Sequence, residues 1–411
     1  MVKTFLKKLM VLTLTVAILA AAACTACAAP NEDIPALDAS SAILVDADRG
    51  QILYGKATSK RLHISIANKI MTAILAIEKA GLGDKVTISK ESANVKGSLL
   101  NLEVGEKYSL ENLLYAAILT SANDAASAVA EYVGGDVNKF VDLMNAKANE
   151  LKMANTVFKN PTGLYDESQY TTAHDLSVLV RYAISNSTFE RIFSSRGIPW
   201  SDGDNSKILL SSNNLFWSYD GVDGGKTGFN DKNSQSAVTT ATRNNLRLVS
   251  VVTDSPEDSV FKDSEQLLNY GFTGFKKGIL VEKGQSLKNL SVNDMGLKLV
   301  SSEDIYYTHP IGDNYIIKLE IKTEQTLNPP ITRDMVLGIA TYILKDNTII
   351  DVKLYSDTDI KPAQDSLSYF LNKIKAHRDL FLIVVFLLIV ELILAIYNIN
   401  RFIRKKLIEN R

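Results

Sequence analysis

Apolar residues recur at helical spacing in several stretches of the chain. From Ile70 onward they follow the period of about 3.6 residues that places side chains on one face of a helix, and Ser65 is predicted to be its N-cap. A buried helix is expected to follow Ser109, and further helices are predicted over residues 136–151 and 260–270.

Alternating apolar and polar positions predict strands on both sides of these helices. Residues 42–46 and 51–54 flank a tight turn that ends at Gly50, which predicts a hairpin. Residues 236–241 and 246–252 alternate like neighbouring antiparallel strands. Because strands and helices are mixed in this way, the pattern predicts an α+β fold.

The pattern changes after Gly278 to short strands separated by turns. The predicted strands cover residues 287–292, 315–321, 335–344 and 349–355. We therefore expect a small all-β domain over residues 278–360, after a larger domain over residues 34–277.

The N-terminus has the features of a signal peptide over residues 1–28. Lysines precede an apolar run, and small residues end at Ala28. Both cysteines of the chain, Cys24 and Cys27, lie in this segment, so cleavage would leave a mature protein without disulfides. Lipid modification at Cys24 is the alternative.

A second apolar run at the C-terminus predicts a membrane anchor. Residues 380–397 contain one charge, at Glu391, and are long enough to span a bilayer as a transmembrane helix. Residues 361–379 are expected to be a linker. The basic residues of segment 398–411 favour the cytoplasmic side, so the bulk of this single-pass protein is expected outside the cell membrane.

The composition excludes several other functional classes. The chain has 411 residues, of which 46% are hydrophobic and 22% charged, and its net charge of −1 gives no reason to expect a nucleic-acid partner. The four histidines lack the spacing of metal ligands, and no phosphate-binding glycine loop is present. No metal and no cofactor are expected.

Five motifs follow one another along residues 34–277. They are Ser41–Tyr54, Lys69–Ala73, Leu113–Tyr115 with Ser121–Ala126, Asn160–Leu164 and Val222–Gly228. In this order the set resembles the low-molecular-mass penicillin-binding proteins, which have a serine β-lactamase-like fold and act as D-alanyl-D-alanine carboxypeptidases. The resemblance implies an antiparallel sheet packed with helices around a cleft.

The resemblance also implies roles for individual residues. Lys69 corresponds to the proton-handling lysine of the S-x-x-K motif, Ser121 and Asn123 to the S-x-N motif, and Lys226, Thr227 and Gly228 to the K-T-G strand that binds substrate. The S-x-N residues are predicted to lie at a helix–helix junction, where a short loop can direct side chains into a cleft. Lys226 and Thr227 suit the C-terminal carboxylate of a peptide, and the strand suits pairing with an extended peptide.

One departure from the family pattern bears on catalysis. Ile66 occupies the position of the nucleophilic serine, and a hydrocarbon cannot attack an acyl group. Ser65 is the alternative nucleophile, but a shift of one position turns a side chain by about 100° around the helix axis. Without a partner hydroxyl, Lys69 is expected to be a structural ion bonded to Ser121 and Asn123.

A second departure lies after the K-T-G strand. Asn230, Asn233 and Ser234 replace a threonine and a pair of small residues that are usual in the family, so the backbone beside the strand is expected to differ.

Two functions follow as hypotheses. The first is a membrane-tethered, catalytically impaired protein of cell-wall peptidoglycan metabolism, which recognises D-Ala-D-Ala stem peptides, β-lactams or a cell-wall protein partner without cleavage. The alternative is an active serine-type D-Ala-D-Ala carboxypeptidase that uses Ser65.

Overall fold

The computed structural model describes residues 34–202, 205–230, 234–292, 295–312, 314–323, 327, 330–361, 375 and 377–409. The predicted signal peptide and most of the predicted linker lie outside these residues. The chain divides into two compact units, the first formed by Met1–Leu280 with Tyr306–Ile316 and the second by Val281–Ile305 with Ile317–Arg411. We describe each unit by itself.

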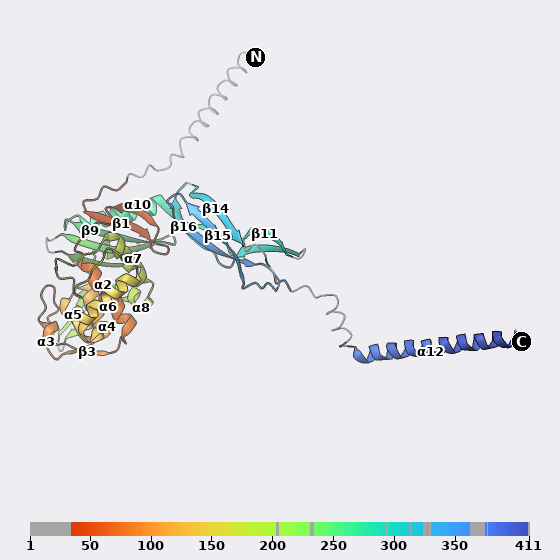
Figure 1. Ribbon diagram of the computed structural model, residues 1–411. Coiled ribbons are helices and arrows are strands. Elements are labelled where there is room, and N and C mark those ends of the chain that lie inside the picture. The colour runs from red at the N-terminus through yellow and green to blue at the C-terminus, as the bar shows by residue number, and fades with distance from the viewer. Residues whose placement is uncertain are drawn as a thin grey trace, which may run out of the picture. The chain divides into compact units, whose positions relative to one another are not determined.

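The first unit is built on a five-stranded antiparallel sheet with the strand order β2-β1-β9-β8-β7 (Figure 1). The strands are β1 (Ser41–Asp46), β2 (Ile52–Lys56), β7 (Val222–Phe229), β8 (Gln235–Arg243) and β9 (Leu246–Ser255). The predicted hairpin is confirmed as β1 paired with β2, and the predicted neighbouring strands are confirmed as β8 paired with β9.

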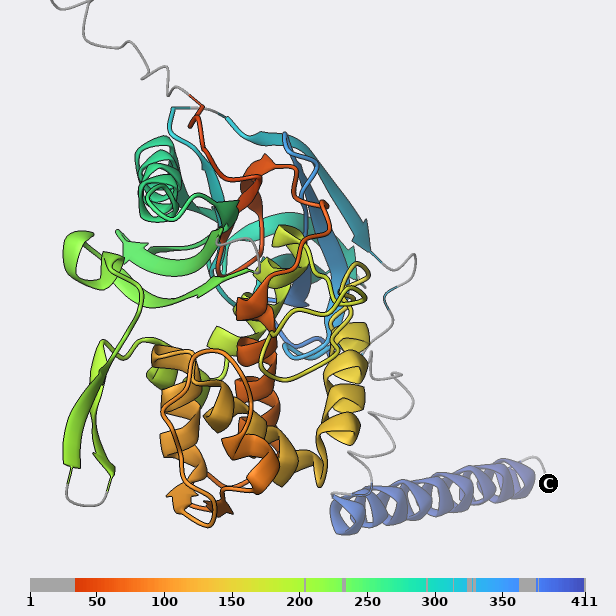
Figure 2. The same ribbon diagram turned by 90° about the vertical axis from the view of Figure 1, so that its left-hand side faces the viewer.

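Helices cover both faces of this sheet, as Figures 1 and 2 show. One face packs against α10 (Val260–Gly274), and the other packs against α2 (Ser65–Lys79) and α7 (Ala173–Ile184). Strand β1 is buried along its whole length because it contributes to both cores. Ile43 and Val45 belong to the core around α2, whereas Ala42 and Leu44 belong to the core beneath α10.

Helix α2 is the central helix of the first unit. Its residues from Ile66 to Ala76 are all buried. The helices α4, α5, α6, α7 and α8 pack around it. Their bounds are Leu110–Leu119 for α4, Asn123–Gly134 for α5, Val137–Glu150 for α6 and Ser187–Phe193 for α8. The short helices α3 (Lys90–Ala93) and α9 (Leu215–Ser218) complete the unit.

The predicted helices are confirmed, with one error at the start of α2. The predicted helices over 136–151 and 260–270 correspond to α6 and α10. The assignment of Ser65 as an N-cap is wrong, because Ile64 holds the extended N-cap conformation and Ser65 is the first helical residue. The Ser65 hydroxyl does not cap the helix but donates to a carbonyl of β7.

Two small two-stranded antiparallel sheets of the first unit were not anticipated from the sequence. One pairs β3 (Lys85–Thr87) with β4 (Lys107–Ser109), and the other pairs β5 (Gly197–Asp202) with β6 (Asn205–Leu210).

The second unit contains a five-stranded sheet with the order β11-β12-β16-β15-β14. These strands are β11 (Ser286–Val292), β12 (Met295–Ser301), β14 (Ile316–Thr323), β15 (Val336–Leu344) and β16 (Ile349–Ser356). Four of them coincide with the strands predicted after Gly278, so the prediction of a C-terminal all-β domain is confirmed.

Strands β10 (Phe275–Val281) and β13 (Ile305–Pro310) form a separate two-stranded sheet. In the sequence, β10 precedes β11, and β13 lies between β12 and β14. Segment Tyr306–Ile316 clusters with the first unit, so the division of the chain by contacts differs here from the expected boundary at residue 278. The Thr308 hydroxyl donates to the Asp46 carboxylate, and the amide of Ile311 donates to the carbonyl of Gly274 over 2.9 Å.

The C-terminal helix α12 extends over Arg378–Glu409 (Figure 1). Its segment Leu382–Arg401 is long and apolar enough to cross a membrane, and it is the one such helix among the residues the structure describes. The predicted apolar C-terminal helix is therefore present, although the helix continues through most of the predicted basic tail.

Candidate functional site

The sequence-predicted residues meet in a cleft of about 280 Å³ in the first unit. Ser65, Lys69, Ser121, Asn123, Thr227 and Gly228 all line it. Lys226 reaches the cleft through Ser121, since its Nζ donates to Ser121 Oγ over 2.6 Å. The walls come from the first turns of α2, the α4–α5 junction, strand β7 and the loop at residues 162–164.

The junction between α4 and α5 directs Ser121 toward β7. Helix α4 ends at Leu119 and α5 begins at Asn123, which confirms the predicted helix–helix junction. Ser121 has a φ of 59°, a left-handed conformation that is unusual for a residue with a side chain. Its Oγ accepts the Lys226 hydrogen bond and donates to the Thr227 carbonyl over 3.4 Å. The strained turn is therefore held by contacts with the K-T-G strand.

Lys69 is buried in the cleft with a neutral partner. Its side chain is 5% exposed, and its Nζ donates to the carbonyl of Thr162. Burial lowers the pKa of Lys69 to about 7, because removal from water penalises the ammonium form. The expectation that Lys69 is bonded to Ser121 and Asn123 is wrong, since the loop carbonyl takes this place and Ser121 is bonded to Lys226.

Lys226 is the second buried amine of the site. It is 1% exposed and donates to the carbonyl of Ile118 over 2.9 Å as well as to Ser121. Burial, followed by the nearby charge of Lys69, lowers the pKa of Lys226 well below its usual range. Among the described residues that line the cleft, none carries a carboxylate to balance the two amines.

Residues 65 and 66 point to different surroundings at the start of α2. Ile66 is 1% exposed and belongs to the apolar core, so no hydroxyl is presented from this position. Ser65 faces the cleft, where its Oγ donates to the carbonyl of Phe229 over 2.9 Å. Within the described part of the chain, Ser65 and Lys69 hydrogen-bond to different groups and not to one another.

Two glycines let the first turn of α2 lie close to the cleft walls. A Cβ on Gly228 would come within 2.7 Å of Ser65 Oγ and 3.1 Å of Ile66 Cγ1. Gly163 has a φ of +79°, and a Cβ there would lie 2.6 Å from the Ser65 carbonyl oxygen. Any larger side chain would therefore displace the segment that carries Ser65 and Lys69.

Asn123 and Thr227 present polar atoms at the cleft. Asn123 Nδ2 donates to the carbonyl of Lys96 over 2.6 Å, while its Oδ1 is buried without a hydrogen-bond partner in the described residues. Thr227 Oγ1 bonds Ser212 Oγ over 2.7 Å. Such groups can pair with amide and carboxylate groups of a bound peptide.

Sequence reasoning missed two polar residues of the cleft. Thr162 supplies the carbonyl that holds Lys69, and the N-P-T-G motif that contains it was noted without a role. Ser212 bonds Thr227, but no pattern in its loop distinguished it from any solvated serine. Asn68 fixes the same loop, since its Nδ2 donates to the carbonyl of Asn160 over 2.6 Å and to Gln169 Oε1 over 2.7 Å.

The residues after the K-T-G strand form a closed turn. The Asn230 amide donates to the Ser234 carbonyl, and the Ser234 amide donates to Asn230 Oδ1, both over 2.9 Å. Asn230 Nδ2 also donates to Asp254 Oδ1 over 3.1 Å. Asn233, the third departure in this region, lies outside the described residues. The two described substitutions thus bond to their own loop and to β9.

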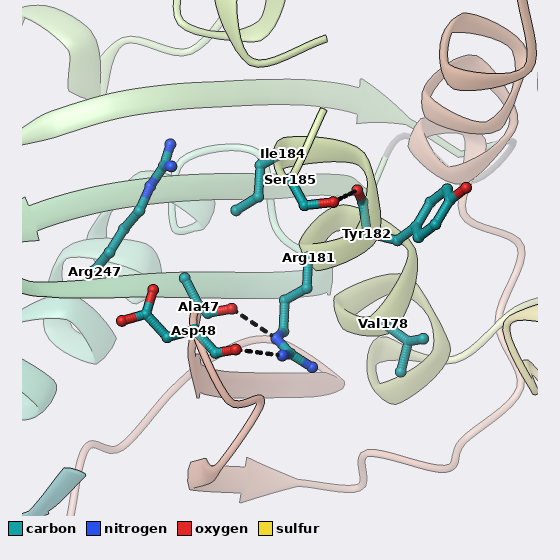
Figure 3. Close-up of a pocket in the computed structure, with 8 residues that line it drawn as sticks. All are labelled: Ala47, Asp48, Val178, Arg181, Tyr182, Ile184, Ser185 and Arg247. Atoms are coloured by element: carbon teal, nitrogen blue, oxygen red, sulfur yellow. Dashed lines mark hydrogen bonds between the residues drawn. The ribbon is translucent and has the colours of Figure 1, made fainter. Parts of the chain in front are cut away.

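A larger cavity of about 490 Å³ lies elsewhere in the first unit (Figure 3). Figure 3 shows Arg181 of α7 pointing to the turn after β1, where it donates to the carbonyls of Ala47 and Asp48 over 2.9 and 3.0 Å. Arg247 pairs with Glu190 and Asp223. Asp48, from the first of the five motifs, also lines this cavity, but its carboxylate is paired with Lys277. Because these charged groups are committed to structural partners, and the other four motifs supply no residue here, the smaller cleft is the candidate site.

Comparison with known proteins agrees with the geometry of the cleft. The family of D-alanyl-D-alanine carboxypeptidases matches residues 26–257, and the C-terminal domain of penicillin-binding protein 5 matches residues 275–362. The D-alanyl-D-alanine carboxypeptidase DacF of Bacillus subtilis is 31% identical over 320 residues, which cover 75% of this chain and 82% of that protein. DacC of Escherichia coli is 30% identical over 335 residues, covering 77% of this chain and 83% of DacC.

Solved structures that are similar to this chain are also penicillin-binding proteins. Penicillin-binding protein 5 of Haemophilus influenzae superposes with a TM-score of 0.68 at 26% identity, over 80% of this chain and 98% of that one. A peptidoglycan synthesis regulatory factor (PBP3) of Streptococcus pneumoniae has a TM-score of 0.67 at 26% identity, over 79% of this chain and all of its own. The chain therefore belongs to the D-alanyl-D-alanine carboxypeptidase family, with the β-lactamase-like body and C-terminal β-domain of penicillin-binding protein 5.

Proposed function

We propose that this protein binds the D-Ala-D-Ala ends of peptidoglycan stem peptides outside the cell membrane without efficient cleavage. The observation that carries the proposal is the buried hydrocarbon of Ile66 at the nucleophile position, next to a cleft that keeps Lys69, Ser121, Asn123 and Thr227. The family supplies the substrate class, and this substitution supplies the departure from its activity.

The chemistry of acyl transfer explains why the substitution is severe. An acyl-enzyme forms when a hydroxyl attacks the peptide carbonyl while a base accepts its proton. Lys69, whose pKa is about 7, can be neutral at physiological pH and could accept a proton, but Ile66 has none to give. Loss of the nucleophile in a serine protease costs about a millionfold in turnover. A comparable loss here would leave no useful hydrolysis.

Binding makes smaller demands than cleavage. Lys69 lines the cleft and Lys226 donates to Ser121 of its wall, while the described lining contains no carboxylate. A peptide C-terminus could supply that negative charge and would favour the ammonium forms of the two amines. Strand β7 is an edge strand of its sheet, so its free backbone groups can pair with an extended peptide. Neither interaction needs a hydroxyl at position 66.

The anchoring follows from the apolar part of α12. Segment Leu382–Arg401 has the length of a membrane span, and the predicted signal peptide would export the body. We propose that α12 tethers the body to the outer face of the cell membrane, with the basic tail in the cytoplasm. At this location the cleft would meet stem peptides or a cell-wall protein partner.

Acylation by a fluorescent β-lactam tests the impaired-enzyme proposal. The purified chain is expected to form no covalent adduct by gel or intact mass, because Ile66 supplies no hydroxyl at the nucleophile position. Ile66→Ser should restore slow labelling, and Ile66→Ala is the matched control that opens space without adding a hydroxyl. Titration with a D-Ala-D-Ala peptide should give reversible binding, which Thr227→Val weakens.

Ser65 carries the alternative of an active carboxypeptidase. The observation in its favour is that its Oγ lines the same cleft as Lys69. Labelling of the unmodified chain that disappears in Ser65→Ala would establish this shifted nucleophile and overturn the proposal. If neither chain is labelled and no peptide binds, recognition of stem peptides is wrong and the cleft is vestigial.

A further inference from the structure

Helix α12 carries an acidic residue at the centre of its apolar segment. Glu391 lies nine residues after Leu382 and ten before Arg401. At a rise of about 1.5 Å per residue, it is about 14 Å from one end of the segment and about 15 Å from the other. In a spanning helix this position is the middle of the hydrocarbon layer, where ionisable side chains are rare and functional.

Two further residues, Ala395 and Asn398, lie on the same face of α12 as Glu391. Ala395 and Asn398 follow at i+4 and i+7, and seven residues return to within about 20° of the same helix face. The opposite face is apolar over the same depth, with exposed side chains at Ile389, Ile393 and neighbouring positions. From residue 389 to 398 the helix thus has one face with a carboxyl, a small residue and an amide, and an opposite face of apolar side chains. Asn400 lies on the opposite face, next to Arg401 at the end of the segment.

The described part of the chain offers Glu391 no hydrogen-bond partner. The side chains that the structure describes in Leu382–Arg401 are largely exposed, and none of that window is buried. A carboxyl group left alone in hydrocarbon costs about 2.5–3.5 kcal/mol even on the lower scales. A partner that satisfies it at the same depth would remove most of this cost.

We propose that α12 pairs in parallel with α12 of a second copy of this chain through the face of Glu391, Ala395 and Asn398. This rests on the proposed membrane anchoring, which gives both copies the same orientation. In a twofold symmetric parallel pair, each residue meets its own equivalent at equal depth. A protonated carboxyl and an amide each donate and accept, so both polar residues are self-complementary, and Ala395 allows the close approach between them.

The depths of the two polar residues in the membrane favour a second copy of this chain over a different helix as the partner. A foreign partner would need matching polar groups at two levels, about 10 Å apart along the helix. A second copy supplies both of them automatically. A pair of anchors would hold two clefts at the same place on the membrane. The affinity for cross-linked or multivalent peptidoglycan would then rise, because the second cleft binds at a high effective concentration.

Cysteine cross-linking in membranes tests the helix face. Ala395→Cys lies on the proposed interface, and Ile393→Cys, about 160° away around the axis, is the matched control. Oxidation should give a product of twice the chain mass for Ala395→Cys and little for Ile393→Cys. The unsubstituted chain, oxidised in parallel, reports any product that arises from Cys24 or Cys27.

Substitution of Glu391 tests the chemistry of the interface. Glu391→Leu should lower cross-linking of Ala395→Cys by roughly three- to thirtyfold, the range expected for polar contacts between membrane helices. Glu391→Gln keeps a group that donates and accepts, so it should retain most of the product. Equal products from Ala395→Cys and Ile393→Cys, or no effect of Glu391→Leu, would overturn the proposal.

The design separates failure of this inference from failure of the anchor. Extraction with alkaline carbonate asks whether the chain is integral to the membrane. Release into the supernatant would contradict the proposed anchoring. Retention together with absent cross-linking at Ala395→Cys, or a cross-linked product with the mass of a different protein, would overturn the pairing with a second copy and leave the anchor and the cleft untouched.

Discussion

A lysine with a pKa near neutrality is of catalytic use only if a proton donor stands beside it. Lys69 owes its pKa of about 7 to burial alone, since its one described hydrogen bond goes to a neutral carbonyl. The side chain of Ile66 points into the apolar core, and by the family resemblance position 66 is where a hydroxyl is expected. On the proposed assignment of Lys69 as the base, the chain keeps the buried surroundings of the base but lacks a hydroxyl at position 66.

Burial of Lys69 should make the stability of the body depend on pH in a defined direction. The folded pKa is about 7, below the ordinary value, so between these two pH values the unfolded chain binds the proton that the folded chain lacks. Stability should therefore rise with pH above about 7. Below pH 7 Lys69 is a buried ammonium in the folded state, so the folded state bears the full free-energy cost of removing this charge from water.

Lys69→Met is expected to remove this contribution. Urea unfolding of the chain truncated before α12, at pH 7 and pH 9, should show a gain in unfolding free energy that is smaller by about 2 kcal/mol in Lys69→Met than in the parent. Lys79→Met, an exposed position at the other end of α2, is the control. An identical pH dependence in the Lys69→Met and parent chains would contradict the assignment.

The sequence was informative about which residues form the site but not about their bonds. The predicted residues line the cleft or, in the case of Lys226, donate to a residue that lines it. All of them except Ser65 are part of a motif that the family pattern orders along the chain. Thr162 as the partner of Lys69 was not foreseen, since a backbone carbonyl leaves no trace in side-chain identity. For Ser65, a cap and a cleft contact look alike in sequence, and only the position of Phe229 decided between them.

At the scale of elements, one carboxylate joins a wall of the cleft to helix α5. Asp124 is 0% exposed and accepts hydrogen bonds from the amides of Leu100, over 2.9 Å, and Leu102, over 3.2 Å. These amides belong to the loop that follows Gly97 and Ser98, which line the cleft. The residue beside Asn123 thus fixes the loop that Asn123 also contacts.

Removal of this carboxylate should loosen the cleft wall. Asp124→Ala would remove the acceptor of three amides, those of Leu100, Leu102 and Ala125, and should lower the unfolding free energy by about 3 kcal/mol, measured by urea unfolding. Hydrogen exchange at Leu100 and Leu102 should accelerate in the same variant. Asp142→Ala, on the exposed side of α6, should change stability by no more than about 0.5 kcal/mol. Unchanged exchange at both amides would show that other contacts hold the loop.

Local elements were predicted better than their arrangement. The hairpin of β1 and β2 and the pairing of β8 with β9 follow from alternation and short connections. The place of β1 between β2 and β9 could not be predicted, because pairing across some two hundred residues of sequence leaves no periodic signal. The β5–β6 hairpin was missed for a related reason, since only one of its faces packs on the body and Ile208 and Leu210 are exposed.

At the scale of the whole molecule, the two units are interleaved in sequence. The chain leaves the first unit near Leu280 and returns to it for Tyr306–Ile316 before it enters the second unit again. The returning segment places Thr308 against Asp46 and the carbonyl of Tyr306 against Arg49 Nε, over 2.6 Å for the latter pair. A cut at a single position between the units would therefore separate Tyr306–Ile316 from residues it contacts.

The charges at the two ends of α12 predict the topology of the anchored protein. Five basic residues lie between Arg401 and Arg411, against three, Lys373, Lys375 and Arg378, in the ten residues before Leu382. Basic residues near a membrane span are retained on the cytoplasmic side, and export by the predicted signal peptide would place the body on the opposite side. The cleft should therefore face the wall and the tail the cytoplasm.

Protease accessibility in cells stripped of their wall measures this arrangement. Protease added from outside should remove the body and leave a C-terminal tag attached to a fragment of about the size of α12, because the bilayer shields the tail. Permeabilised cells are the control and should lose the tag as well. A tag that is cleaved in intact cells would place the C-terminus outside, and the basic tail would then have failed to orient the helix.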